Sequence, residues 1–254
     1  MLIDVNCWLG FWPFQMFPQL SAARLARHLS ARGVSKAFVS PIESVLCPDP
    51  HVPSRQLLGK LKAQPNLIPV PVLDPSLTSW QECLNEYIEA GHGQALKIIP
   101  NYHRYELDAP CVESLAKVLS GRPRSVLMIQ MRVEDERHQY PLMKVPGVSV
   151  AAVIAFARRH ADVRILCLCS YLKEAEQMVG QAKNIWVDTA LIEYANTLKH
   201  ALNLIPGNRM LFGSHTPFLY TRASIMKLEC AEIPGKDLTA IASGNARQLL
   251  SQEF

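Results

Sequence analysis

The sequence has no long hydrophobic run, no CxxC or HxxxH pair and no glycine-rich phosphate loop. No apolar stretch approaches the roughly 20 residues that a membrane helix needs, so we expect no membrane partner. Neither a CxxC nor an HxxxH spacing occurs, which leaves no compact zinc motif. No basic stripe with interleaved aromatic residues occurs either, so we expect no nucleic-acid partner. These absences leave a small-molecule substrate as the expected partner.

Apolar residues are what the chain has in quantity, since 49% of its 254 residues are hydrophobic. The formal net charge of +4 is small, and the short basic clusters at residues 122–124 and 158–160 are expected to be solvated helix faces. The length suits one barrel domain over residues 1–254. The apolar content is also consistent with a homo-oligomer, because a sequence does not distinguish apolar residues of a subunit interface from those of the core.

The cysteines indicate the compartment. There are seven, an odd number, and the apolar neighbours of Cys167 and Cys169 predict reduced, buried thiols. Reduced thiols favour a reducing compartment. The first predicted strand contains Asp4 and has no basic segment before it, so we expect no signal peptide. These features together predict a cytoplasmic protein.

Short apolar segments alternate with segments of helical spacing along the whole chain. Strands that are apolar throughout are typical of a parallel sheet buried on both faces. Eight such units without a glycine-rich fingerprint favour an α/β (β/α)8 TIM barrel over an open doubly wound sheet. The predicted strands are residues 1–8, 37–40, 67–73, 94–99, 125–131, 163–169, 185–189 and 210–213, and the predicted helices are residues 21–32, 55–63, 80–90, 111–119, 150–160, 174–180, 195–204 and 223–230, with a final helical turn within residues 238–250.

Polar side chains mark the carboxyl ends of these strands, which meet at one rim of a barrel. At residues 209–218 an apolar run ends in a Gly-Ser turn, presents His215 and is stopped by Pro217. Lys97 stands on an otherwise apolar strand and needs a compensating partner, because an unpaired buried ammonium is costly. The residues singled out are Asn6, Trp8, Lys97, Gln130, Cys169, Asp188 and His215 at strand ends, and Asn101, Tyr102, His103, Glu134, Glu136, Arg137 and His138 in loops.

Several of these residues have a purely structural alternative. Trp8 is equally typical of a packed aromatic, and Cys169 of a small core residue. Asn6 and Gln130 suit the capping of backbone groups, and Asp188 suits a helix cap or a partner for Lys97. The polar loop of residues 134–138 is equally consistent with a solvated turn.

Four segments carry a family resemblance. Residues 3–8 resemble the first-strand Ile-Asp-x-His-x-His motif, and residues 163–169 the sixth-strand motif, of the amidohydrolase-related branch of the amidohydrolase superfamily. Residues 211–217 are similar to its eighth-strand Phe-Gly-Ser-Asp-x-Pro, and residues 244–246 to its closing segment. The resemblance spans nearly the whole chain. It implies a metal-dependent hydrolase or decarboxylase built on a (β/α)8 barrel.

The residues that depart from the family pattern are its metal ligands. The two first-strand histidines are replaced by Asn6 and Trp8, the fifth-strand histidine corresponds to Gln130, and the sixth-strand histidine to Cys169. The eighth-strand aspartate is His215. Amides are poor zinc ligands and an indole offers none, so we expect no metal cofactor at the family's usual site.

The first hypothesis is a metal-independent hydrolase. His215 is then the general base and Lys97 stabilises the oxyanion in place of the metal. Arg137 and His103 are expected to hold a carboxylate of the substrate, which predicts a small carboxylated lactone or amide. The predicted catalytic residues are His215, Lys97, Gln130 and Asn6, and the predicted substrate contacts are Trp8, Tyr102, His103, Glu134, Arg137, His138 and Asp188.

Two alternatives belong to other classes. One is a relocated metal site that holds zinc with His103, His138 and His215. The other is a catalytically inactive barrel kept as a binding or subunit protein. In that case the aromatic segment 12–17 is a docking surface, whereas in an enzyme it is a lid over the barrel mouth.

Overall fold

The computed structural model describes residues 1–18 and 21–250, in which strands and helices alternate as the sequence predicts. The strands are β1 (Leu2–Leu9), β2 (Val34–Pro41), β3 (Leu67–Pro69), β4 (Ala95–Ile98), β5 (Val126–Gln130), β6 (Arg164–Leu168), β7 (Ile185–Asp188) and β8 (Met210–Leu211). The helices are α1 (Ala22–Ser30), α2 (His51–Leu61), α3 (Trp80–Glu89), α4 (Pro100–His103), α5 (Pro110–Ser120), α6 (Val150–Arg159), α7 (Leu172–Gln181), α8 (Thr197–Leu202), α9 (Thr221–Glu229), α10 (Gly235–Thr239) and α11 (Asn245–Leu250). Shorter helical turns are η1 (Ile42–Val45), η2 (Pro141–Met143), η3 (Gly207–Arg209) and the π-helical η4 (Ala240–Gly244).

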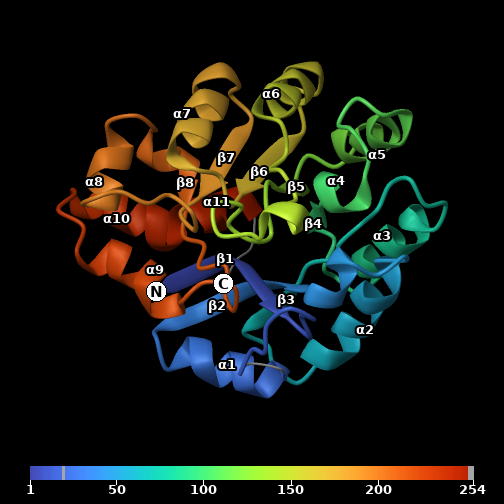
Figure 1. Ribbon diagram of the computed structural model, residues 1–254, viewed down its shortest axis with the longest axis horizontal. Coiled ribbons are helices and arrows are strands. Elements are labelled where there is room, and N and C mark those ends of the chain that lie inside the picture. The colour runs from blue at the N-terminus through green and yellow to red at the C-terminus, as the bar shows by residue number, and fades with distance from the viewer. Residues whose placement is uncertain (19–20, 251–254) are drawn as a thin grey trace.

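The eight strands close into a ring, and most of the helices lie outside it (Figure 1). Parallel pairing gives a three-stranded sheet, β1-β2-β3, and a five-stranded sheet from β4 to β8 in chain order. At one junction the backbone N–H of Trp8 donates to the carbonyl of Thr216 (2.7 Å), just beyond β8. At the other, the N–H of Lys97 donates to the carbonyl of Pro71 (2.8 Å). The predicted (β/α)8 barrel is therefore confirmed.

The third strand is shorter than the predicted segment 67–73. Regular pairing with β2 ends at Pro69, because Pro69 and Pro71 have no N–H to donate. Beyond that point the chain uses the donors that remain, with Leu73 N bonded to the Lys97 carbonyl (2.8 Å). The expected loops also contain short helices, η1 after β2 and α4 after β4.

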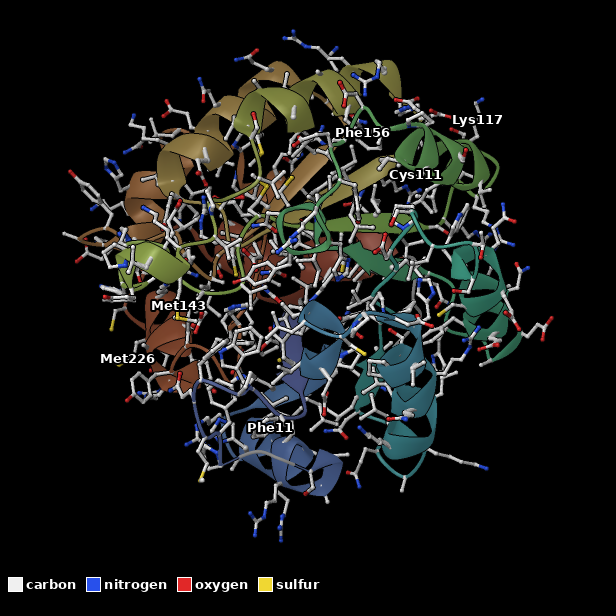
Figure 2. The ribbon with its side chains drawn as sticks, turned by 45° about the vertical axis from the view of Figure 1, so that its right-hand side comes forward. Phe11, Cys111, Lys117, Met143, Phe156 and Met226 are labelled. Atoms are coloured by element: carbon white, nitrogen blue, oxygen red, sulfur yellow. The ribbon has the colours of Figure 1, made fainter. Side chains whose placement is uncertain are left out.

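Two apolar layers hold the ring together. Side chains that point into the barrel include Ile3, Val5, Val126 and Leu166, and helix-facing strand residues pack in a larger outer layer. In that layer Phe156 of α6 lies fully buried between its helix and the strands, whereas Lys117 of α5 points to solvent (Figure 2). Alternation of neighbouring strand residues between the layers explains why both faces are apolar.

The C-terminal helix closes the amino end of the ring. Ala246, Leu249 and Leu250 join the interior apolar cluster. Asn245 locks the helix in place, since its Nδ2 donates to the carbonyls of Gly207 (2.8 Å) and Met210 (2.7 Å). The family-like segment 244–246 therefore has a packing role in this chain.

Two further expectations bear on composition. The seven cysteines are all unpaired thiols, and Cys167 and Cys169 are buried. Within residues 1–18 and 21–250 no helix combines the length and the apolar character that crossing a bilayer requires.

Replacement of Asn245 by alanine leaves the buried Met210 carbonyl and the partly buried Gly207 carbonyl without this donor. We expect Asn245→Ala to lower the free energy of unfolding by about 1–3 kcal/mol, measured by chemical denaturation. The neighbouring Asn208 is exposed. Asn208→Ala should therefore change stability by less than about 0.5 kcal/mol. Equal effects of the two substitutions would contradict the locking role.

Candidate active site

Four polar side chains meet inside the carboxyl end of the ring. Asn6 is at the centre: its Nδ2 donates to Asp188 Oδ2 (2.8 Å) and lies 3.3 Å from Cys169 Sγ. Its Oδ1 accepts a hydrogen bond from Lys97 Nζ at 3.4 Å. None of the four is more than 1% exposed. The structure thus brings together four of the strand-end residues singled out in the sequence, from β1, β4, β7 and the end of β6.

Local backbone geometry holds the carboxylate of this cluster. Asp188 Oδ1 accepts the backbone N–H of Cys169 (2.8 Å), a residue with a left-handed φ of 58°. A Cβ on Gly213 would lie 2.6 Å from Asp188 Oδ2, so glycine is required there. Asp4 accepts the N–H groups of Asn6 (3.1 Å) and Ser214 (3.0 Å) and joins the ends of β1 and β8.

Trp8 and His215 form a layer above the cluster. Lys97 Nζ lies 3.8 Å from the centroid of the Trp8 ring, a cation–π contact. Trp8 Nε1 donates to His215 Nδ1 (3.1 Å), and His215 Nε2 lies 2.6 Å from the Val133 carbonyl. Nδ1 is therefore an acceptor and Nε2 carries the proton, which makes His215 a neutral ring with both nitrogens engaged.

Burial is the main cause of the pKa shifts in these two layers. It lowers the pKa of Lys97 to about 7 and raises the pKa of Asp188 to about 6. It also lowers the pKa of His215 to about 3. The His215 ring is consequently uncharged at neutral pH.

Gln130 and Arg132 stabilise the loop that follows β5. Gln130 Nε2 donates to the Arg132 carbonyl (2.6 Å), and its Oε1 has no hydrogen-bond partner within the described part of the chain. The guanidinium of Arg132 is 1% exposed, binds both oxygens of Glu174 (2.8 and 2.6 Å) and stacks on Tyr171. No motif in the sequence indicates this partly buried ion pair.

A cavity of about 630 Å³ opens above the His215 layer at the barrel mouth. We call this space the mouth cavity. Lys97, Asn6 and Asp188 do not border it, so Trp8 and His215 separate the buried cluster from the mouth cavity. It is lined by Trp12, Phe14, Gln15, Leu46, Asn101, Tyr102, Arg104, Val133, Glu134, Asp135, His138, Gln139, Tyr140, Met143, Val145, Leu191, His215, Phe218 and Leu219.

The loop residues predicted as substrate contacts divide into two groups. Tyr102, Glu134 and His138 line the mouth cavity. Arg137 does not: its guanidinium binds Asp135 and Glu193. His103 does not either, because its Nε2 bonds to the carbonyl of Ser44 (2.9 Å). Their expected role in holding a carboxylate stays a prediction that these contacts do not favour.

Arg104 is a charged cavity residue that was not singled out in the sequence. It ends α4 with a left-handed φ of 60°, which directs the chain away from the helix. Its side chain is exposed and forms no ion pair with any residue in 1–18 or 21–250. Its position within the predicted loop after β4 was the only available signal.

The aromatic segment 12–17 both packs and projects. Trp12 and Phe17 are 2% exposed and contact Phe218, with ring centroids 5.3 and 5.1 Å away. Phe14 and Met16 point outward. Met143 of η2 is also exposed at the edge of the mouth cavity (Figure 2). Trp12 and Phe17 therefore cover the barrel mouth. Phe14 and Met16 add to the exposed apolar surface around it.

The side chains present do not suit a divalent metal. Within the described ranges, no group of three or more His, Cys, Asp and Glu residues is placed to hold a metal ion. The alternative zinc site is not assembled, since His103 binds a carbonyl, His138 is 82% exposed and His215 uses both nitrogens. At the position to which the sequence resemblance assigns a metal, the Asn6 oxygen already accepts a hydrogen bond from Lys97.

The strands and helices define a (β/α)8 barrel with polar side chains at the carboxyl ends of its strands. No family model and no curated protein matches the sequence. Similar solved structures are a dihydroxybenzoic acid decarboxylase from Polaromonas sp. with bound manganese (14% identity, 98% of this chain and 96% of that chain, TM-score 0.77), 5-carboxyvanillate decarboxylase from Sphingomonas paucimobilis (14%, 99% and 99%, 0.76) and a putative amidohydrolase from Staphylococcus aureus (10%, 99% and 99%, 0.73). The predicted resemblance is confirmed in the fold.

The hydrogen bonds of His215 predict its behaviour in solution. Between pH 8 and pH 5 we expect its imidazole nitrogens to show the neutral tautomer protonated at Nε2, without titration, in nitrogen-detected NMR. Trp8→Phe keeps the aromatic face but removes the N–H donor, so Nδ1 should become more basic and the His215 pKa should rise. A midpoint near 6.5 in the unmodified protein would refute this assignment.

Proposed function

We propose that the protein is an enzyme that hydrolyses a small carboxylated lactone or amide in the mouth cavity without a divalent metal. The observation that carries this proposal is the cavity itself. It opens at the carboxyl ends of the strands, where (β/α)8 enzymes hold their substrates. Its volume of about 630 Å³ suits a small ligand, and its aromatic walls include a few polar groups.

Glu134 is the proposed general base. Its half-buried carboxylate lines the cavity, and Oε1 is oriented by the indole N–H of Trp12 (3.1 Å). In the proposed step Glu134 takes a proton from water, and the resulting hydroxide oxygen attacks the carbonyl carbon. The carbon–oxygen or carbon–nitrogen bond then breaks, and the proton passes from Glu134 to the leaving group.

Tyr102 and Arg104 are the proposed groups that bind the substrate. Burial, and secondarily the charge of Glu134, raise the pKa of Tyr102, so its hydroxyl remains a hydrogen-bond donor for a developing oxyanion. The unpaired guanidinium of Arg104 suits a carboxylate, with which it can form two parallel hydrogen bonds. The two decarboxylases of similar fold are named for carboxylated aromatic substrates, which supports an acidic group on the ligand.

This assignment differs from the roles that the sequence suggests for His215 and Lys97. A general base needs a free lone pair, and the His215 Nδ1 lone pair accepts the Trp8 N–H. An oxyanion stabiliser must touch the substrate, and Lys97 lies beneath the Trp8 ring. In the proposal His215 forms the floor of the cavity. Lys97 has no contact with the substrate and affects it only through Trp8.

A second candidate function is ligand binding without chemistry. It is favoured by one observation: Asn6, Lys97 and Asp188 interact with one another and do not border the cavity, and His215, which does border it, already uses both ring nitrogens. The two candidates differ in a panel screen of small lactones and amides. Turnover supports the enzyme, whereas binding of the same compounds without turnover supports the binding protein.

Neutralisation of the proposed base should separate binding from catalysis. We expect Glu134→Gln to lower kcat by roughly 10²–10⁴-fold while the affinity for the substrate changes little, measured by steady-state kinetics and calorimetry. Glu136 is the matched control, because it pairs with Arg132 and does not line the cavity. Unchanged turnover in Glu134→Gln would eliminate this residue as the base.

Removal of the unpaired guanidinium should affect only acidic ligands. We expect Arg104→Met to raise KM by roughly 10- to 100-fold for a carboxylated substrate, because a hydrogen bond to a charged group is lost. The KM for the corresponding methyl ester should hardly change. An equal loss for the acid and its ester would mean that Arg104 does not read the carboxylate.

A further inference from the structure

We propose that the ammonium group of Lys97 is the built-in cation of this barrel and occupies the position of a metal ion at the strand ends. The folded protein then has no divalent metal site there. The inference concerns the buried cluster and holds whatever reaction the mouth cavity carries.

The ammonium of Lys97 lies where a metal ion would be expected. Asn6, Trp8 and Cys169 stand where the family resemblance puts metal ligands. Lys97 reaches in from β4 between these residues, with Nζ 3.4 Å from Asn6 Oδ1 and 3.8 Å from the Trp8 ring centroid. A single positive charge therefore lies among the side chains that would otherwise surround a metal.

The neighbours of Lys97 suit a cation. The amide of Asn6 is oriented by charge on both sides: Oδ1 faces the ammonium, and Nδ2 faces the carboxylate of Asp188. Trp8 presents the negative face of its ring to the ammonium and directs its N–H away, to His215. Asn6 and Trp8 would serve a metal badly, but they serve an ammonium well.

A divalent ion could enter this cluster only at high cost. It would have to displace the ammonium from the Asn6 oxygen or remain beside it against like-charge repulsion. The nearby thiol of Cys169 would need to ionise, and burial raises its pKa well above the ordinary value. Two features therefore disfavour a metal at this site: the ligands that the resemblance predicts are replaced, and the charge of Lys97 occupies the space between the replacements.

The first experiment measures metal directly. Untagged protein is incubated with excess zinc or manganese, desalted and analysed for metal, in parallel with Cys169→Ser. We expect less than about 0.1 metal ion per chain, and no shift of the melting temperature on addition of either metal. Near-stoichiometric metal that Cys169→Ser removes would overturn the proposal. Metal that remains in Cys169→Ser is measured again in Asp188→Asn: its loss there would also overturn the proposal, whereas its retention in both variants would place the metal outside the cluster.

The second experiment is a double-mutant cycle between Lys97 and Asp188, measured by chemical denaturation. Lys97→Met should reduce the folding equilibrium constant by roughly 100- to 1,000-fold, because it leaves a buried carboxylate without its cation. Lys97→Met combined with Asp188→Asn should recover at least about tenfold of this loss. Lys199 is exposed and pairs with Glu232, so the effects of Lys199→Met and Asp188→Asn should multiply.

The cycle remains informative if Lys97→Met does not fold. Folding of the double variant alone is the expected rescue. Failure of both variants, or equal stability of the two, would show that Asp188 does not depend on the ammonium and would overturn the proposal.

Discussion

The ammonium of Lys97 lies against the Trp8 ring and the Asn6 amide, in the middle of the carboxyl ends of the strands. Because a buried charge costs several kcal/mol unless it is compensated, the side chains around it have little freedom. Asn6 must turn its oxygen to the lysine, Asp188 must face the Asn6 nitrogen, and Gly213 must leave room for that carboxylate. The orientations of Asn6 and Asp188 are thus linked to this one charge.

The same constraint determines where a ligand can bind. Trp8 covers the ammonium with its face and uses its N–H to hold His215, whose second nitrogen binds the loop after β5 through the Val133 carbonyl. The polar cluster is thereby cut off from solvent. The groups available to a ligand come mainly from the loops. Among them are Tyr102, Arg104 and Glu134, to which the proposed function assigns roles.

The fold could be predicted because its signals are local: apolar strands, helical spacing and their eightfold alternation. Part of the site was also predictable, since Lys97 on an apolar strand had to have a partner and its neighbours come from strand ends. The loop contacts were not. Whether Arg104 or Arg137 faces the cavity depends on Asp135 and Glu193, which neutralise Arg137, and Glu193 is far from Arg137 in sequence. The engagement of both His215 nitrogens likewise required Trp8 and Val133, which lie in other parts of the chain.

The mouth cavity and the buried cluster meet only at the layer formed by Trp8 and His215. Side chains such as Phe14, Leu46 and Tyr140 line the cavity without touching the charges beneath it. Exchanges among them alter the shape of the cavity at little risk to folding, whereas the cluster tolerates almost no change. The barrel in this sense separates two tasks: the loop side chains around the mouth cavity determine its shape, and the cluster around Lys97 holds the strand ends together beneath it.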